Sequence, residues 1–201
     1  MKRLALVLAL AGLFAPSLSA ADLSAAELKR ATDYLKKTSQ EFLAATKGLS
    51  QAQLDFKSAP DRWSVAEVAE HITATEDRLR GLVEKQVLKA PARAEPVNVQ
   101  EIDDFILQVI PDRSKKAQAP EELKPTNRFG TPAETMQHFI ASRAKTAALL
   151  RETPGLRDHA IDSPLGKKLD AYQWILFIGA HCERHTRQIV EVKADPNFPK
   201  R

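Results

Sequence analysis

Cysteine is almost absent from this chain of 201 residues, in which Cys182 is the only one. A single cysteine cannot form an internal disulfide, so a small disulfide-stabilised fold is excluded. Cys182 adjoins His181 in sequence, but consecutive helical residues point about 100° apart. We therefore expect Cys182 to be a semi-buried packing residue, and an intermolecular disulfide is the alternative.

Glycine and strand-like patterns are also scarce. The chain has seven glycines, and they form no glycine-rich phosphate loop. No segment shows the sustained alternation of apolar and polar residues that a half-buried strand would show, and no repeat has a fixed period. These absences favour an all-α protein.

Long apolar runs are absent except at the start of the chain. There, residues 4–14 follow two basic residues and precede small residues that end at Ala21. The run is too short for a membrane-spanning helix of about 20 apolar residues, and its flanks are typical of a secretory signal peptide. We expect residues 1–21 to be a signal peptide. The mature domain, residues 22–201, would then be periplasmic or secreted and have no membrane anchor.

The charge of the chain is weak and mixed. The formal net charge is +4 for the whole sequence, or +2 without Lys2 and Arg3. Basic residues are spread among acidic ones rather than clustered, so we expect no nucleic-acid partner.

Capping signals mark the starts of four long helices. At each start a Ser, Thr or Asp precedes a Glu or Gln by three residues, and an apolar stripe of helical period follows. The four predicted helices run from Ser24 to about Gly48, from Ser64 to about Lys89, from Thr131 to about Glu152, and from Asp170 to about Ala194. Two shorter features are a turn near residues 51–56 and a helix between Asn98 and Pro111.

Four helices of this length predict a single four-helix bundle. The connection between the second and third helices, residues 90–130, is far longer than the others. We expect it to cross over, so that these two helices run parallel and the order is up-down-down-up. In its basic part, residues 112–129, Arg113, Lys115 and Lys116 have no aromatic residues interleaved among them and no repeated spacing. We expect it to form a surface strap across the bundle, and anion binding is the alternative.

Three of the five histidines lie on the inward stripes of the predicted helices. His181 and His185 are four residues apart, so their rings stand one turn above each other and can share one metal ion. His71 lies on the inward stripe of the second helix, at a depth that would let it join them. Spacing alone leaves open whether these are metal ligands or satisfied core residues. His138 and His159 fall outside the stripes, and we expect both to be exposed or near a helix cap.

A site of three imidazoles with open coordination positions is typical of catalytic zinc. Nickel, manganese, iron and copper also accept imidazole ligands, so the divalent metal is not fixed by the residues.

Three stretches of this sequence resemble the DinB-like superfamily of metalloenzymes. They are WSVAEVAEHI at 63–72, FGTPAETMQHFIASR at 129–143 and GAHCERHTRQI at 179–189. The pattern H-x-x-x-H-x-x-Q-I in the third stretch is the most specific of them. The resemblance implies a four-helix bundle with the crossover, and a divalent metal held by His71, His181 and His185.

The resemblance also implies a class of chemistry. Some relatives are thiol-dependent transferases or isomerases, in which the metal activates a thiol, and activation of water for hydrolysis is chemically equally open. Our first hypothesis is an exported metal-dependent transferase or hydrolase that acts on a small substrate. The alternatives are a metal- or small-ligand-binding bundle without turnover, and a purely structural bundle.

Three further residues are candidates for supporting the metal ligands. Glu67 and Thr75 lie one turn either side of His71, and Gln188 lies one turn after His185. Glu67 is also a predicted helix cap, and no general base is identifiable. A homodimer is compatible with such a bundle, although nothing in the sequence marks an interface.

Overall fold

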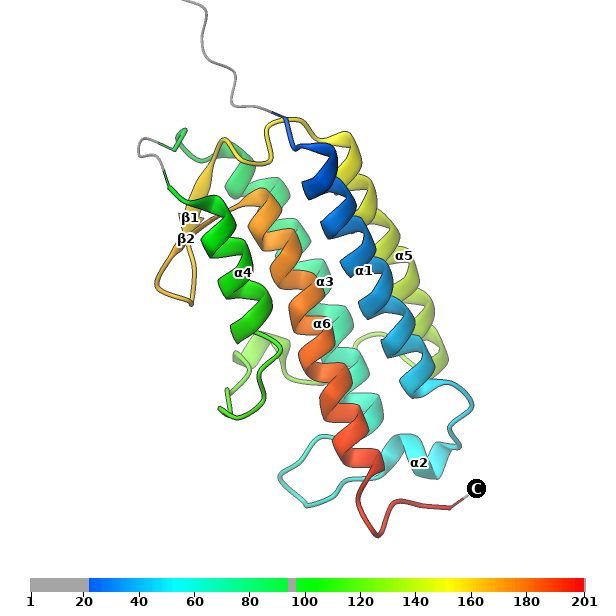
Figure 1. Ribbon diagram of the computed structural model, residues 1–201. Helices are drawn as coiled ribbons and strands as arrows, with labels where there is room; N and C mark the ends of the chain where they lie inside the picture. Colours follow the sequence, from blue (N-terminus) through cyan, green and yellow to red (C-terminus); the bar gives the residue numbers. More distant parts are fainter. Residues whose placement is uncertain (1–21, 94–96, 201) are drawn as a thin grey trace, which may run out of the picture.

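The computed structural model describes residues 22–93 and 97–200, which form an elongated bundle of helices (Figure 1). The predicted signal peptide, residues 1–21, lies outside the described residues. Four long helices make the bundle: α1 (Ala25–Thr46), α3 (Val65–Lys85), α5 (Pro132–Glu152) and α6 (Ala171–Lys193). Among the described residues, no helix has both the length and the apolar content needed to cross a membrane.

The four long helices begin where the capping signals predicted. Ser24, Ser64, Thr131 and Asp170 each accept a hydrogen bond from the backbone N–H three residues later, and the Glu or Gln there closes a capping box. A fifth capping box, at Ser50, starts a short helix, α2 (Gln51–Asp55), where the sequence suggested only a turn. The second predicted helix ends early, because a 3₁₀ turn, η1 (Val87–Lys89), replaces its last residues.

Helices α1 and α6 run parallel, because the residues that bond across them are separated by nearly the same number of positions at both ends, 145 and 148. Tyr172 Oη donates to Glu27 O at 2.9 Å, and Lys193 Nζ donates to Ala45 O at 2.7 Å near the other end of the pair. Helices α3 and α5 also run parallel to each other and opposite to α1 and α6 (Figure 1). The predicted up-down-down-up order is therefore confirmed.

The connection between α3 and α5 is the crossover that this order requires. It contains α4 (Val99–Val109), which packs on α6, and a 3₁₀ turn, η2 (Glu121–Leu123), which contacts α3. Between these two elements the chain lies across the outside of the bundle, as predicted for a strap (Figure 1).

A small hairpin between α5 and α6 was not predicted. Strand β1 (Ala160–Asp162) pairs antiparallel with β2 (Lys168–Asp170). Three residues are too few to show an alternating pattern, so these strands carry no strand signal in the sequence. Gly166 turns the chain between the strands with a φ of +69°, which a residue without Cβ adopts at little cost.

Cys182 lies deeper in the core than predicted. It is 1% exposed, and its Sγ lies 3.5 Å from Thr38 O. Burial raises the pKa of the thiol to about 11, so Cys182 is a packing residue and not a reactive thiolate.

A buried ion pair joins three of the long helices beside Cys182. Arg143 on α5 donates from Nε and Nη2 to the two carboxylate oxygens of Glu76 on α3, at 2.7 and 2.8 Å. Its Nη1 also donates to Leu35 O and Thr38 Oγ1 on α1. Both charged side chains are less than 10% exposed. Because its donors and acceptors are matched, this pair fixes how α1, α3 and α5 pack.

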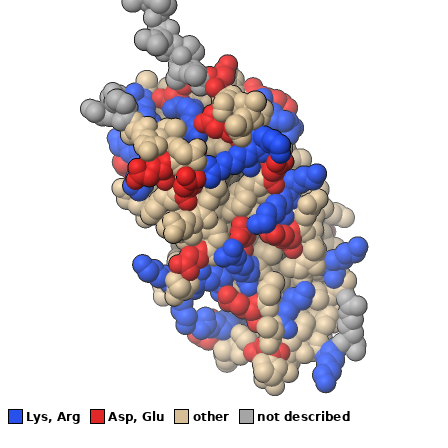
Figure 2. All heavy atoms as spheres, viewed as in Figure 1, with Lys and Arg blue, Asp and Glu red and all other residues tan. Residues whose placement is uncertain are grey.

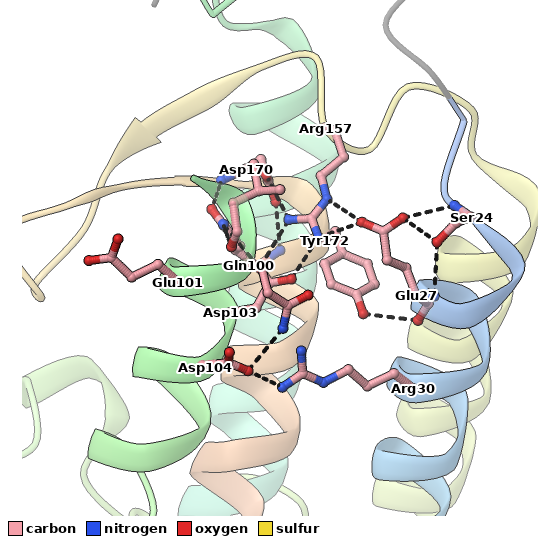
Figure 3. A network of polar contacts seen from close by, with 12 residues as sticks. Ser24, Glu27, Arg30, Gln100, Glu101, Asp103, Asp104, Arg157, Asp170 and Tyr172 are labelled. Atoms are coloured by element: carbon pink, nitrogen blue, oxygen red, sulfur yellow. Dashed lines mark hydrogen bonds and ion pairs between the residues drawn. The ribbon is translucent and has the colours of Figure 1, made fainter. Parts of the chain in front are cut away.

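A second polar network closes the end of the bundle at which α1 and α6 begin (Figure 3). Arg157 pairs with Glu27 on α1, Asp103 on α4 and Asp170 at the start of α6, with N···O distances of 2.7–3.0 Å. Its guanidinium also lies over the ring of Tyr172, 4.1 Å from the centroid. One arginine therefore ties the loop after α5 to three helices.

The surface of the bundle carries both signs of charge. Figure 2 shows Lys and Arg side chains interspersed with Asp and Glu over one face. This mixed surface agrees with the dispersed charge of the sequence.

Candidate metal centre

His71 on α3 and His181 and His185 on α6 lie together in the structure. Their ligand nitrogens all lie within 4.8 Å of one another, and the ring centroids are 4.4–4.9 Å apart. Helical spacing places the two α6 rings one turn apart, and the antiparallel packing of α3 and α6 brings His71 to the same depth. His71 is buried, and His181 and His185 are partly buried. The grouping that the sequence analysis proposed is therefore present.

The ring of His71 is held by the crossover. Its Nδ1 lies 2.9 Å from Leu123 O, the last residue of η2. A carbonyl oxygen only accepts, so Nδ1 carries the proton and Nε2 is left with a free electron pair. That Nε2 faces His181 Nε2 at 3.2 Å. Trp63 lies against the same ring, with centroids 4.9 Å apart, and supplies an apolar wall.

The ring of His185 is held in a similar way by a side chain of its own helix. Its Nδ1 lies 2.8 Å from Gln188 Oε1, which also accepts from Arg113 Nη1 at 3.3 Å. Because an arginine only donates, this contact fixes the amide with its oxygen toward both partners. Arg113 is held in turn by a two-point ion pair with Glu191. His185 therefore also keeps Nδ1 protonated and Nε2 free.

Burial keeps the three rings neutral. Loss of solvation lowers the pKa of His71 and lowers that of His181 well below its usual value. For His185, loss of solvation, aided by the neighbouring His71 and by Arg113 and Arg184, lowers the pKa to about 3. Neutral imidazoles are the form that binds metal, so the site is ready for a cation at neutral pH.

The geometry fits a divalent metal ion. Two nitrogens bound to one tetrahedral zinc at about 2.0–2.1 Å lie roughly 3.3 Å apart, and the two facing Nε2 atoms are separated by 3.2 Å. Two neighbouring nitrogens with free electron pairs repel each other unless a proton or a cation lies between them. The donor set suits zinc and the other imidazole-binding metals.

The three predicted supporting residues have different surroundings. Gln188 contacts His185 as described. Glu67 is engaged elsewhere, because it closes the capping box with Ser64 and pairs with Lys57 at 2.7 Å. Thr75 lies one turn after His71, and its buried Oγ1 has no hydrogen-bond partner among the described residues.

The two remaining histidines lie outside the cluster. His138 Nε2 contacts Asp77 Oδ2 at 2.6 Å, and its side chain is 46% exposed, as predicted. His159 faces Ala92 in an isolated antiparallel bridge and is partly buried.

Sequence reasoning missed the groups that hold the rings from the crossover. Leu123 acts through its main-chain carbonyl, which every residue has, so no sequence signal could have identified it. Arg113 stood in the predicted strap, but its contact with Gln188 depends on how the strap lies on α6.

Comparisons with known proteins agree with this fold. The family model described as the DinB superfamily matches residues 34–189. The uncharacterized protein YuaE of Bacillus subtilis (strain 168) is 30% identical over 148 residues, which are 73% of this chain and 87% of that protein. The chain belongs to the DinB superfamily, which confirms the resemblance seen in the sequence.

A solved structure shows the same architecture. YfiT from Bacillus subtilis matches with a TM-score of 0.55 at 14% sequence identity, and the match covers 94% of this chain and 97% of that chain. YfiT is described as a probable metal-dependent hydrolase with an unusual four-helix bundle topology. At this level of identity the match shows a common fold.

Proposed function

We propose that this chain is an exported metal-dependent enzyme whose divalent metal, zinc first among the candidates, is held by His71, His181 and His185. The observation that carries the proposal is the arrangement of the cluster. Three neutral imidazoles converge from two helices, and two of them have Nδ1 bonded to an acceptor and Nε2 left free. A core histidine with a purely structural role needs no such convergence.

A divalent ion held by these three nitrogens would supply Lewis-acid activation of a water molecule or a thiol. Arg113 and Arg184 help to keep His185 neutral, and Arg128 does the same for His71, so the rings stay in the form that binds metal. Trp63 limits access of solvent to His71. Thr75, one turn after His71, is itself buried, and its Oγ1 has no hydrogen-bond partner among the described residues.

Between the two nucleophiles we favour water, and therefore hydrolysis of a small substrate. YfiT, which shares the fold, is described as a probable metal-dependent hydrolase. Low-molecular-weight thiols are chiefly cytosolic, whereas residues 1–21 have the composition of a signal peptide. Transfer of a group to a thiol is the competing reaction.

Metal analysis tests the proposal directly. Protein purified without chelator should contain about one equivalent of divalent metal, and His181→Ala and His185→Ala should lose it. His138→Ala is the matched control, because it removes a histidine outside the cluster and should keep the metal. A metal-free wild type that refuses zinc, nickel and manganese on titration would overturn the proposal.

Activity screening separates an enzyme from a binding protein. The metal-loaded protein should hydrolyse an ester or a related small electrophile, and His185→Ala should not. Screening with added thiols and epoxides tests the transferase reaction. Stoichiometric metal without turnover in any of these assays would favour a metal- or ligand-binding bundle.

Export can be tested by locating the protein in cells. Cells that produce the full chain should yield a shortened protein in the periplasm or medium, whereas a chain without residues 1–21 should stay in the cytoplasm. Full-length protein in the cytoplasm would contradict export and leave the metal proposal standing.

A further inference from the structure

The contact between His71 and Leu123 O depends on a short segment of the crossover. Leu123 ends the 3₁₀ turn η2, and the residue is 8% exposed. A turn of three residues has little rigidity of its own. Some other contact must therefore hold its last carbonyl within hydrogen-bond distance of the ring.

Arg128 supplies that contact by bonding to the carbonyls on both sides of Leu123. Its Nη1 donates to Glu122 O at 2.9 Å, and its Nη2 donates to Lys124 O. The carbonyl that faces His71 therefore lies between two carbonyls held by one planar guanidinium. Such a fork fixes orientation as well as distance.

Glu70 holds Arg128 in place. Its Oε1 accepts from Arg128 Nε at 3.0 Å, and its two oxygens also accept from the backbone N–H groups of Thr126, Asn127 and Arg128. Burial alone would raise the pKa of this carboxyl, but these backbone N–H groups and Arg128 lower it overall, so it stays charged. Asn127 has a φ of +60°, a left-handed conformation that bends the chain around the carboxylate.

Glu70 directly precedes His71 on α3. The same turn of helix therefore carries a candidate metal ligand and the carboxylate that organises the segment bonded to that ligand. The path runs from Glu70 through Arg128 to the carbonyls around Leu123, and from Leu123 O to His71 Nδ1.

We propose that Arg128 and Glu70 are positioning residues for His71, which fix its Nδ1–H tautomer and aim its Nε2 at the other two rings. The consequence for metal affinity rests on the proposed function, whereas the effect on the tautomer does not. If Arg128 only anchored the crossover, its substitution would lower stability and leave both the tautomer and the metal affinity unchanged.

The test compares Arg128→Ala with a matched control, Arg78→Ala. Arg78 also links α3 to η2, but it pairs with the exposed side chain of Glu122 and bonds to no main-chain carbonyl within residues 22–93 and 97–200. In metal-free protein at pH 8, ¹⁵N NMR of the histidine side chains should show wild-type His71 as the Nδ1–H tautomer. Arg128→Ala should show a mixture of tautomers, and Arg78→Ala should match the wild type.

Metal affinity gives the second readout. In Arg128→Ala, Leu123 O should no longer be held against His71. Competition titration with zinc should then show about a 10- to 100-fold loss of affinity, the usual cost when a ligand loses its outer hydrogen-bond partner. Arg128→Lys keeps the charge but cannot bond to the carbonyls on both sides of Leu123, so it should also lose zinc affinity. It replaces Arg128→Ala in both measurements if that variant does not fold. Full affinity in Arg128→Lys would overturn the proposal, since charge alone would then suffice.

The outcomes separate this inference from the proposed function. If the wild type binds no metal, the metal proposal is contradicted. If the tautomer of His71 nevertheless changes only in Arg128→Ala, the positioning role is supported. A wild type that binds metal, together with an Arg128→Ala variant whose tautomer and affinity equal those of Arg78→Ala, would overturn the positioning role alone.

Discussion

His71 Nε2 lies 3.2 Å from His181 Nε2, although the two residues are 110 positions apart in sequence. The antiparallel packing of α3 and α6 creates this approach, and burial keeps both rings neutral. Two imidazoles at this distance are poised to share one cation. The same burial has a measurable consequence for stability without metal.

The metal-free protein should lose stability as the pH falls from about 6.5 to about 3. An unfolded chain protonates its histidines near pH 6.5, whereas the folded-state pKa values of the three rings are lowered, to about 3 for His185. The unfolded state therefore binds more protons in this window, and acid favours unfolding. Each ring contributes up to about 1.4 kcal/mol per pH unit. Urea unfolding with chelator present, at several pH values, measures the slope.

The triple substitution of His71, His181 and His185 by Gln is the control for that slope. Subtracting its stability curve from that of the wild type removes the contributions of carboxyl groups that titrate in the same range, such as Asp170. Parallel curves between pH 4 and pH 6.5 would mean that the rings are protonated as easily in the folded chain as in the unfolded one.

Gln188 should tune the affinity of the site for metal. Gln188→Leu removes the acceptor of His185 Nδ1–H, and we expect a 10- to 100-fold weaker zinc affinity by competition titration. Gln188→Glu keeps an acceptor at the same place and should stay within about tenfold of the wild type. Equal affinities for the Leu and Glu variants would show that the contact does not support the ligand.

Much of the fold and the cluster could be predicted because both depend on helical periodicity. The capping boxes fixed the helix starts, and the inward stripes identified His71, His181 and His185. The hairpin could not be predicted, since its strands have three residues each. Leu123 could not be predicted either, because it acts through its main chain and its place depends on how the crossover lies on the bundle.

Removing one partner of the buried pair of Glu76 and Arg143 should destabilise the fold more than removing both. Arg143→Met leaves a buried carboxylate without its cation, and we expect a loss of about 3–5 kcal/mol in the free energy of unfolding. Glu76→Leu combined with Arg143→Met removes both charges and should recover a large part of that loss. Urea unfolding of the two variants measures the difference. A double variant less stable than Arg143→Met would show that the remaining hydrogen bonds of the network matter more than the ion pair.

Arg157 should stabilise the end of the bundle at which α1 and α6 begin, by an amount that depends on pH. Burial raises the folded-state pKa of Asp170 to about 6 despite the nearby cations of Arg157 and Arg93. Because this pKa lies above the unfolded value of 3.8, the contribution of Asp170 favours the folded state at low pH and is lost as the pH rises through about 6. Removing Arg157 should raise the pKa of Asp170 further. In acid, protonation of Asp170 then offsets part of the stability that is lost with Arg157.

Arg157→Met should therefore cost about 3–5 kcal/mol at pH 8, where Asp103 and Asp170 lose a shared buried cation, and less at pH 5. Arg30→Met is the matched control, because Arg30 pairs with the exposed Asp104 in the same region (Figure 3). Its cost should be much smaller and nearly the same at both pH values, because water screens this exposed pair. Urea unfolding at both pH values decides the matter. A loss in Arg157→Met that is equal at pH 5 and pH 8 would show that its packing on Tyr172, rather than its charge, stabilises this end.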